Sequence, residues 1–215
     1  MPDLQFQVIR VTVAERAVVP TLLFEIRIAC RTPGIAIEAI ALQCQIRVDP
    51  ARRRYADTEV PRLNDLFGER ERWGETLKGF LWTHVHASVP AFQSHTEFQL
   101  PVPCSYDFNI AATKFFHGIR DGDAPLNLLF RGSVFHHNKS GDLQIEPVPW
   151  TTDAQFRLPI KLWHGMMAQY YPDGVWLPVE RSTLDSLESF RREHRLASWN
   201  EAIELLMKQR PELVS

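Results

Sequence analysis

A strict alternation of apolar and polar residues constrains the fold of this chain more than any other feature. It is clearest from Ile40 to Val48, where Ala41, Gln43, Gln45 and Arg47 separate residues with larger apolar side chains or a thiol. A period of two residues is typical of a β-strand that buries one face and leaves the other face in water. Residues 4–13 and 21–30 have the same alternation, so the first part of the chain is predicted to form strands.

Further strand-like runs follow, and turn residues such as Pro90 and Gly122 lie between them. They cover residues 80–89, 98–102, 126–135, 143–148 and 155–160. Seven or eight short strands separated by turns favour a sandwich or a barrel. We therefore predict an α+β fold that is mainly β: an antiparallel immunoglobulin-like β-sandwich over residues 1–160, with short helical insertions and a C-terminal helical extension over residues 161–215.

The predicted helices have a period near 3.6 residues. One stripe covers residues 60–67, where Thr58 can cap the helix and Gly68 can end it. Residues 107–119 fit a helix about as well as they fit a buried strand, and we predict a helix there. After Pro159 the helical period takes over, and the aromatic and Met residues of that segment predict a helix that packs on the main core.

The C-terminal segment has a strand, helix, helix order. A short extended run at 175–180 precedes Ser182, a candidate helix cap, and Ser198 forms a capping box with Glu201. This order resembles the ribbon-helix-helix module of small bacterial repressors and antitoxins, whose strands read the major groove of DNA. Here the run at 175–180 contains no Lys or Arg, and residues 180–210 carry six basic and six acidic residues. Nucleic-acid binding is therefore disfavoured, and a transcription regulator is kept as an alternative.

The overall charge gives no global field that would attract nucleic acid or an anionic membrane, because 24 Lys and Arg are set against 26 Asp and Glu. The N-terminus has no basic stretch and no apolar run, and nowhere do 18 apolar residues follow one another. We therefore expect a cytoplasmic protein without a membrane partner. None of the three cysteines (Cys30, Cys44 and Cys104) belongs to a C-x-x-C pair, and we expect free thiols rather than disulfides.

The densest basic run is a candidate contact for a partner protein. Arg52, Arg53 and Arg54 precede Tyr55 in a predicted loop. Such a run is usually a solvated surface, but guanidinium groups also recognise carboxylates in a two-pronged geometry. We keep these four residues as a partner-binding candidate.

Two histidines are a metal-binding candidate. His84 and His86 lie two residues apart on a predicted strand, so their imidazoles would point the same way. A third ligand is needed, and the sequence does not select one among several other histidines and Glu97. The alternative function is a metal-dependent enzyme. No phosphate-binding loop, nucleophile elbow or diagnostic carboxylate pair is present, so neither catalytic residues nor a cofactor are predicted.

Several stretches together resemble an uncharacterised bacterial family, the DUF6084 family, across nearly the whole chain. They are ALQCQIR at 41–47, LFG at 66–68 with Trp73, FLWTHV at 80–85, LPVPC at 100–104, FRGSVF at 130–135 and VPW at 148–150. The resemblance implies a shared fold, supplies no activity, and associates the family with genes of actinobacterial-type nickel-iron hydrogenases. The leading hypothesis is a non-enzymatic accessory module that binds another protein, such as a hydrogenase subunit or maturation factor.

Overall fold

A computed structural model describes the protein over residues 2–107, 110–138, 140–149, 151–172, 174 and 179–209. The chain forms two compact units, Met1–Trp176 and Leu177–Ser215, called here the body and the C-terminal unit. The sequence pattern predicts the boundary between the sandwich and the C-terminal extension at residue 160. The division falls later because helix α4 (Ile160–Tyr170) buries Trp163 and Met167 in the core of the body.

The described part of the body contains eight strands. These are β1 (Leu4–Val13), β2 (Thr21–Cys30), β3 (Ile37–Val48), β4 (Phe80–Val89), β5 (His95–Pro103), β6 (Asp123–His137), β7 (Leu143–Pro147) and β8 (Asp153–Pro159). One antiparallel sheet has the order β1-β2-β5, and a second has the order β4-β3-β6-β7 with β8 also paired to β6. The prediction of a mainly antiparallel β fold with helices is confirmed.

Strand β6 organises the larger sheet. Along one side it pairs with β3, from Ile37 opposite His136 to Val48 opposite Leu126. Along the other side, its first half pairs with β8 and its last residues pair with β7. Gly132 lies opposite Leu42 at the middle of this pairing with β3 and has a φ angle of 142°.

The alternating residues fill a core that both sheets share. On β3, the residues at even positions from Ile40 to Val48 are buried, as the alternation predicts. The rings of Phe6 on β1 and Phe130 on β6 stack with their centroids 4.4 Å apart. Phe24 on β2 meets Phe156 on β8 edge to face at 5.8 Å. These aromatic contacts join the smaller sheet to the larger one.

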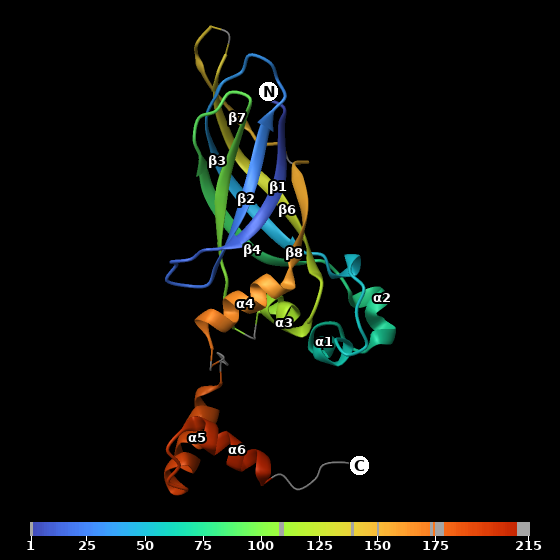
Figure 1. The fold of residues 1–215 in the computed structure, drawn as a ribbon, viewed down its shortest axis with the longest axis vertical. Coiled ribbons are helices and arrows are strands. Elements are labelled where there is room, and N and C mark those ends of the chain that lie inside the picture. The colour runs from blue at the N-terminus through green and yellow to red at the C-terminus, as the bar shows by residue number, and fades with distance from the viewer. Residues whose placement is uncertain are drawn as a thin grey trace. The chain divides into compact units, whose positions relative to one another are not determined.

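Four helices of the body lie at one end of the strands (Figure 1). They are α1 (Val60–Phe67), α2 (Trp73–Thr76), α3 (Ala111–Gly118) and α4, and short 3-10 turns occur at Pro50–Arg52 and Arg70–Arg72. Helix α1 follows Glu59 and has no side-chain cap, so Thr58 does not have the predicted capping role. None of the described helices is long and apolar enough to cross a membrane.

The C-terminal unit contains two helices in its described residues, α5 (Arg181–Glu193) and α6 (Trp199–Lys208). The predicted capping box is confirmed at Ser198, whose hydroxyl accepts the Glu201 amide at 3.1 Å. Helix α5 starts at Arg181 without a side-chain cap, so the predicted cap at Ser182 is wrong. Most of the extended run predicted at 175–180 lies outside the described residues.

Candidate functional site

The basic run lies just after β3, at the end of the sheets that carries the helices. Residues Pro50–Arg52 form a 3-10 turn, in which Pro50 provides the fixed φ angle that a first helical residue needs. The amide of Asp49 donates to the carbonyl of Pro125 at 2.9 Å. This hydrogen bond holds the basic run next to the start of β6.

Arg53 points into the body rather than toward solvent. Its guanidinium donates two hydrogen bonds to the Glu59 carboxylate, at 2.8 and 2.9 Å, and a further one to the carbonyl of Asp121. Only 8% of the Arg53 side chain and 4% of the Glu59 side chain are exposed. This two-pronged geometry is the one in which Arg and a carboxylate bind most strongly.

The Glu59 carboxylate also binds two backbone amides. It accepts the amide of Arg120 at 2.7 Å and the amide of Ala56 at 3.1 Å. Burial alone would raise the pKa of the Glu59 carboxyl, but the hydrogen bonds from Arg53, Arg120 and Ala56 outweigh it, so the pKa lies below its ordinary value. Glu59 is therefore ionised at neutral pH and ties residues 53–59 to the end of α3.

Tyr55 supports the same segment. Its hydroxyl donates to the carbonyl of Pro50 at 2.7 Å, and its ring meets Trp73 edge to face at 5.1 Å. The Arg53 guanidinium lies 5.0 Å from the centre of the Tyr55 ring, within cation–π range. Burial raises the pKa of the Tyr55 hydroxyl well above its ordinary value. Both residues hold the shape of the segment.

The other arginines of the run face a shallow groove. This arginine groove is lined by residues 51–54 and by Arg157, which comes from β8. A neighbouring hollow shares Arg52 and Arg157 with it and adds Leu126 and Phe156. The Arg157 guanidinium donates to the carbonyl of Arg52 at 3.2 Å, which fixes its position.

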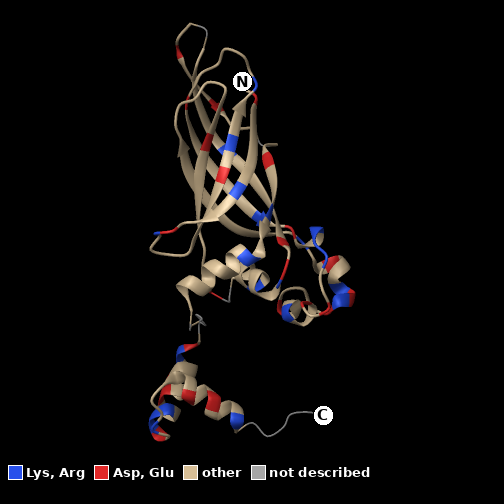
Figure 2. Cartoon of the chain, in the orientation of Figure 1, with Lys and Arg blue, Asp and Glu red and all other residues tan. Residues whose placement is uncertain are grey.

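The arginine groove holds an excess of positive charge. Arg52 lies 3.9 Å from the Asp49 carboxylate, and both side chains are partly exposed. Within the described part of the chain, no carboxylate lies within ion-pair distance of Arg54 or Arg157. Elsewhere on the body the two signs of charge are interspersed (Figure 2). The groove is thus suited to an anionic group of a ligand or partner.

His84 and His86 point outward from β4, as predicted. In the sheet, His86 lies opposite Gln43 and His84 lies opposite Gln45, and both imidazoles are exposed. The described residues contain no group of three or more His, Cys, Asp or Glu side chains that could hold a metal ion.

The candidate third ligands are dispersed. His95 and Glu97 belong to β5 in the other sheet, and His117 lies on α3. His136 is buried, with its Nε2 atom 3.6 Å from the Glu146 carboxylate, and His137 lies 3.3 Å from Glu38. The structure does not bring these side chains to His84 and His86.

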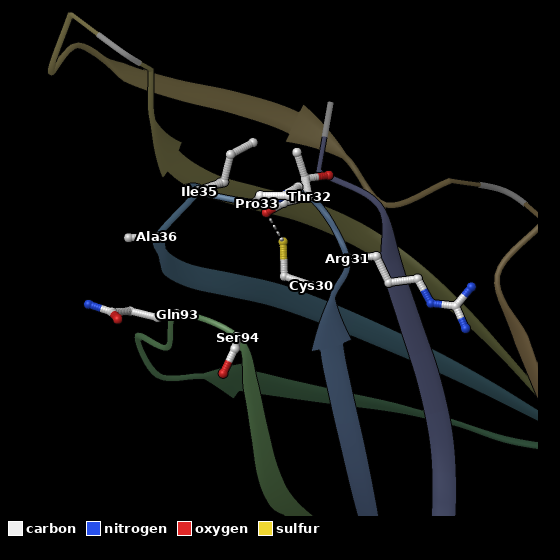
Figure 3. A pocket seen from close by; sticks show the side chains of 9 residues that line it. Cys30, Arg31, Thr32, Pro33, Ile35, Ala36, Gln93 and Ser94 are labelled. Carbon is white, nitrogen blue, oxygen red and sulfur yellow. Dashed lines mark hydrogen bonds between the residues drawn. The ribbon is translucent and has the colours of Figure 1, made fainter.

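A separate hollow lies at the opposite end of the body, between the loops β2–β3 and β4–β5 (Figure 3). The Cys30 thiol contacts the carbonyl of Thr32 at 3.8 Å, and the Arg31 side chain points away from the hollow. Uncharged side chains and backbone make up most of the lining, so this hollow offers little for binding an ion.

The model of the DUF6084 family, described as a family of unknown function, matches residues 1–214. The chain belongs to this family. No curated protein matches the sequence. Among solved structures, the CARDB domain of the PF1109 protein from Pyrococcus furiosus, in complex with di-metal ions, is 9% identical. That match covers 74% of this DUF6084 chain and 87% of the other chain, with a TM-score of 0.28.

Sequence reasoning selected part of the groove of this DUF6084 protein and missed the rest. Arg52 and Arg54 were named because they are adjacent in sequence, and they do face the groove. Arg157 was missed because it lies on a strand about a hundred residues later, and only the pairing of β8 with β6 brings it close. Glu59 is a nearby acid that could be expected to neutralise part of the run, but the sequence does not show that Arg53 and Glu59 form a buried pair.

The cysteines of this DUF6084 protein are expected to differ in reactivity. Burial raises the pKa of Cys44 and of Cys104 to about 12, whereas Cys30 is half-buried beside a hollow. Since the thiolate is the reactive form, titration with a thiol reagent at pH 7.5 should modify one cysteine per native chain and three in urea. A Cys30→Ser variant should lack the native reaction. Rapid modification of a second thiol in the native protein would contradict this assignment.

Proposed function

We propose that this protein is a non-enzymatic accessory module of the bacterial cytoplasm that binds an acidic segment of another protein through the arginine groove. The scaffold would be an immunoglobulin-like β-sandwich. From the family resemblance, the partner to be tested first is a nickel-iron hydrogenase subunit or a maturation factor.

The proposal rests on one observation. Arg52, Arg54 and Arg157 line the same groove and have too few acidic neighbours to balance their charge. Like charges held together destabilise a protein by mutual repulsion, so such an arrangement needs a compensating reason to persist. A carboxylate from a partner would supply one, because guanidinium groups bind it with two parallel hydrogen bonds.

The groove is also preorganised. The buried Arg53–Glu59 pair fixes the loop, and the Arg157 guanidinium is bound to the backbone of Arg52. A rigid site loses less conformational entropy when a partner binds.

Charge reversal tests this proposal. We expect Arg54→Glu with Arg157→Glu to weaken partner binding by about 10- to 100-fold, since close charge pairs at interfaces couple by about 1.5 kcal/mol or more. Binding of the purified protein to purified hydrogenase subunits and maturation factors, measured by biolayer interferometry at low and high salt, checks the change. Arg131→Glu is the matched control, because Arg131 is an exposed arginine on the outer face of β6.

Two results would count against the proposal at different levels. If no hydrogenase component binds the unmodified protein, that choice of partner is wrong. If a partner binds and the groove variant binds it as tightly as the unmodified protein does, or if Arg131→Glu weakens binding equally, the arginine groove is not the contact surface.

A further inference from the structure

The arginine groove has a positive charge that the described part of the protein does not balance. Three of its guanidinium groups lie outside the buried Arg53–Glu59 pair, and they belong to the groove arginines, Arg52, Arg54 and Arg157. Asp49, 3.9 Å from Arg52, is the one carboxylate within ion-pair distance of a groove arginine among the described residues. Three positive charges and one negative charge leave a net charge of +2.

The lining of the groove offers mainly hydrogen-bond donors. A guanidinium is rich in N–H donors and has no acceptor, so two of its N–H groups can point in parallel at one anion. Arg157 uses one nitrogen to donate to the carbonyl of Arg52 at 3.2 Å. The neighbouring hollow adds the side-chain amide of Gln155, and none of the described residues that line either hollow is acidic. An anionic group in the groove therefore has several donors to accept from.

The charge and the donors of the groove favour a phosphate over a carboxylate. A carboxylate has one negative charge, and its two oxygens accept about four hydrogen bonds, which two guanidinium groups already supply. It would leave one positive charge unbalanced and one groove arginine without a partner. A phosphate monoester has a charge of about −1.5 to −2 at pH 7 and three strong acceptor oxygens. It therefore matches the net charge and gives each groove arginine an oxygen.

The size and shape of the groove favour a phosphate that belongs to a larger molecule. The groove has a volume of about 540 Å³, within the range that accommodates a drug-sized molecule rather than a single ion. Arg52 and Arg157 also line the second hollow, of about 250 Å³. Sites for small molecules usually enclose most of the ligand, whereas this groove is shallow. A protein segment would fill it with the residues on either side of the phosphate.

We propose that the acidic group bound by the arginine groove is a phosphorylated side chain of the partner protein. This inference rests on the proposed function and names the chemistry of the ligand. The groove arginines bind the phosphate oxygens with parallel N–H donors. Arg53 keeps its contact with Glu59 and holds the loop in the shape that binds the ligand.

Binding of three short peptides to the full chain tests this proposal. The peptides differ only at a central position, which is phosphoserine, glutamate or serine, and carry no other charge. We expect the phosphoserine peptide to bind at least about tenfold more tightly than the glutamate peptide, because a third guanidinium gains a partner. The serine peptide should not bind measurably. Calorimetric titrations at one ionic strength measure the dissociation constants.

Two variants of the groove distinguish paired hydrogen bonds from charge alone. Arg54→Lys keeps the positive charge but replaces the planar fork by a point charge, and it should lower the affinity for phosphoserine about three- to tenfold. Arg54→Glu with Arg157→Glu should lower that affinity about 100-fold or more. Arg131→Glu is the control and should leave it unchanged, since Arg131 lies farther along β6 than Pro125, the residue opposite Arg157.

A carboxylate site would bind the glutamate peptide as tightly as the phosphoserine peptide, and that result would overturn this inference while leaving the proposed acidic contact in place. Phosphoserine binding that survives the double charge reversal, or an unchanged affinity in Arg54→Lys, would overturn the assignment to the groove arginines. Inorganic phosphate that displaces the phosphoserine peptide at equal concentration would identify a site for the free ion instead. The proposed function fails separately, if the double reversal leaves binding of the protein partner unchanged.

Discussion

Replacing Glu59 by Ala is expected to lower the free energy of unfolding by about 3–5 kcal/mol, the usual cost of leaving one partner of a buried ion pair alone. The change leaves the Arg53 guanidinium buried without its counter-ion. It also removes the acceptor for the amides of Arg120 and Ala56. Urea unfolding at pH 7, followed by tryptophan fluorescence, measures the loss.

The exposed ion pair between Arg27 and Glu97 gives a matched control. Its side chains are 49% and 38% exposed, so Glu97→Ala should cost less than about 1 kcal/mol. If Glu59→Ala lowers the free energy of unfolding no more than Glu97→Ala does, the buried Arg53–Glu59 pair does not stabilise the loop.

The same pair predicts an acid dependence of stability. The pKa of Glu59 is lower in the folded protein than its ordinary value of 4.5. The ionised carboxylate therefore contributes its full stability above that ordinary value. The contribution is lost as the pH falls from there through the lower pKa of the folded state. The difference in unfolding free energy between the unmodified protein and Glu59→Gln should accordingly shrink on acidification.

Gly132→Ala is expected to destabilise the protein by about 4 kcal/mol or more, or to prevent its folding. A Cβ atom at this position would lie 1.9 Å from the carbonyl oxygen of Ala41 on β3. That oxygen belongs to the backbone of the central strand pairing, so no side-chain rotation can relieve the overlap. The φ angle of 142° adds strain for any residue with a Cβ.

Gly165→Ala is the control for this substitution. Gly165 lies inside α4, and a Cβ atom there would meet nothing within 4 Å. Alanine in a helix interior is favoured over glycine by about 0.5–1 kcal/mol, so this variant should be slightly more stable. Soluble yield and urea unfolding compare the two variants. A Gly132→Ala protein as stable as the unmodified one would mean that β3 and β6 do not approach so closely.

The strands could be predicted from the sequence because each buries one face. The alternation from Ile40 to Val48 shows which side of the strand is buried. It can be recognised without knowing which strands lie beside it. The helix after Pro159 could be predicted for the same reason, since Trp163 and Met167 repeat at helical spacing and are buried. The prediction that this helix packs on the main core is confirmed, because both residues belong to the core of the body.

The site could be predicted only in part because it depends on contacts between distant segments. Nothing near Arg53 in the sequence shows that the Asp121 carbonyl, 68 residues away, accepts a hydrogen bond from its guanidinium. Arg157 reaches the groove because β8 pairs with the first half of β6. Alternation identifies the strands but does not show which strands become neighbours. A site formed by β8 together with the loop after β3 therefore cannot be predicted from it.

The pairing of β3 with β6 also has a consequence during synthesis. Residues 49–122 separate the two strands, and a ribosome adding about 5–20 residues per second needs roughly 4–15 s to make that stretch. Throughout this interval the edge of β3 that pairs with β6 has no partner, so its backbone N–H and C=O groups on that edge are open to other chains. The nascent polypeptide is therefore a natural client for a chaperone until β6 emerges.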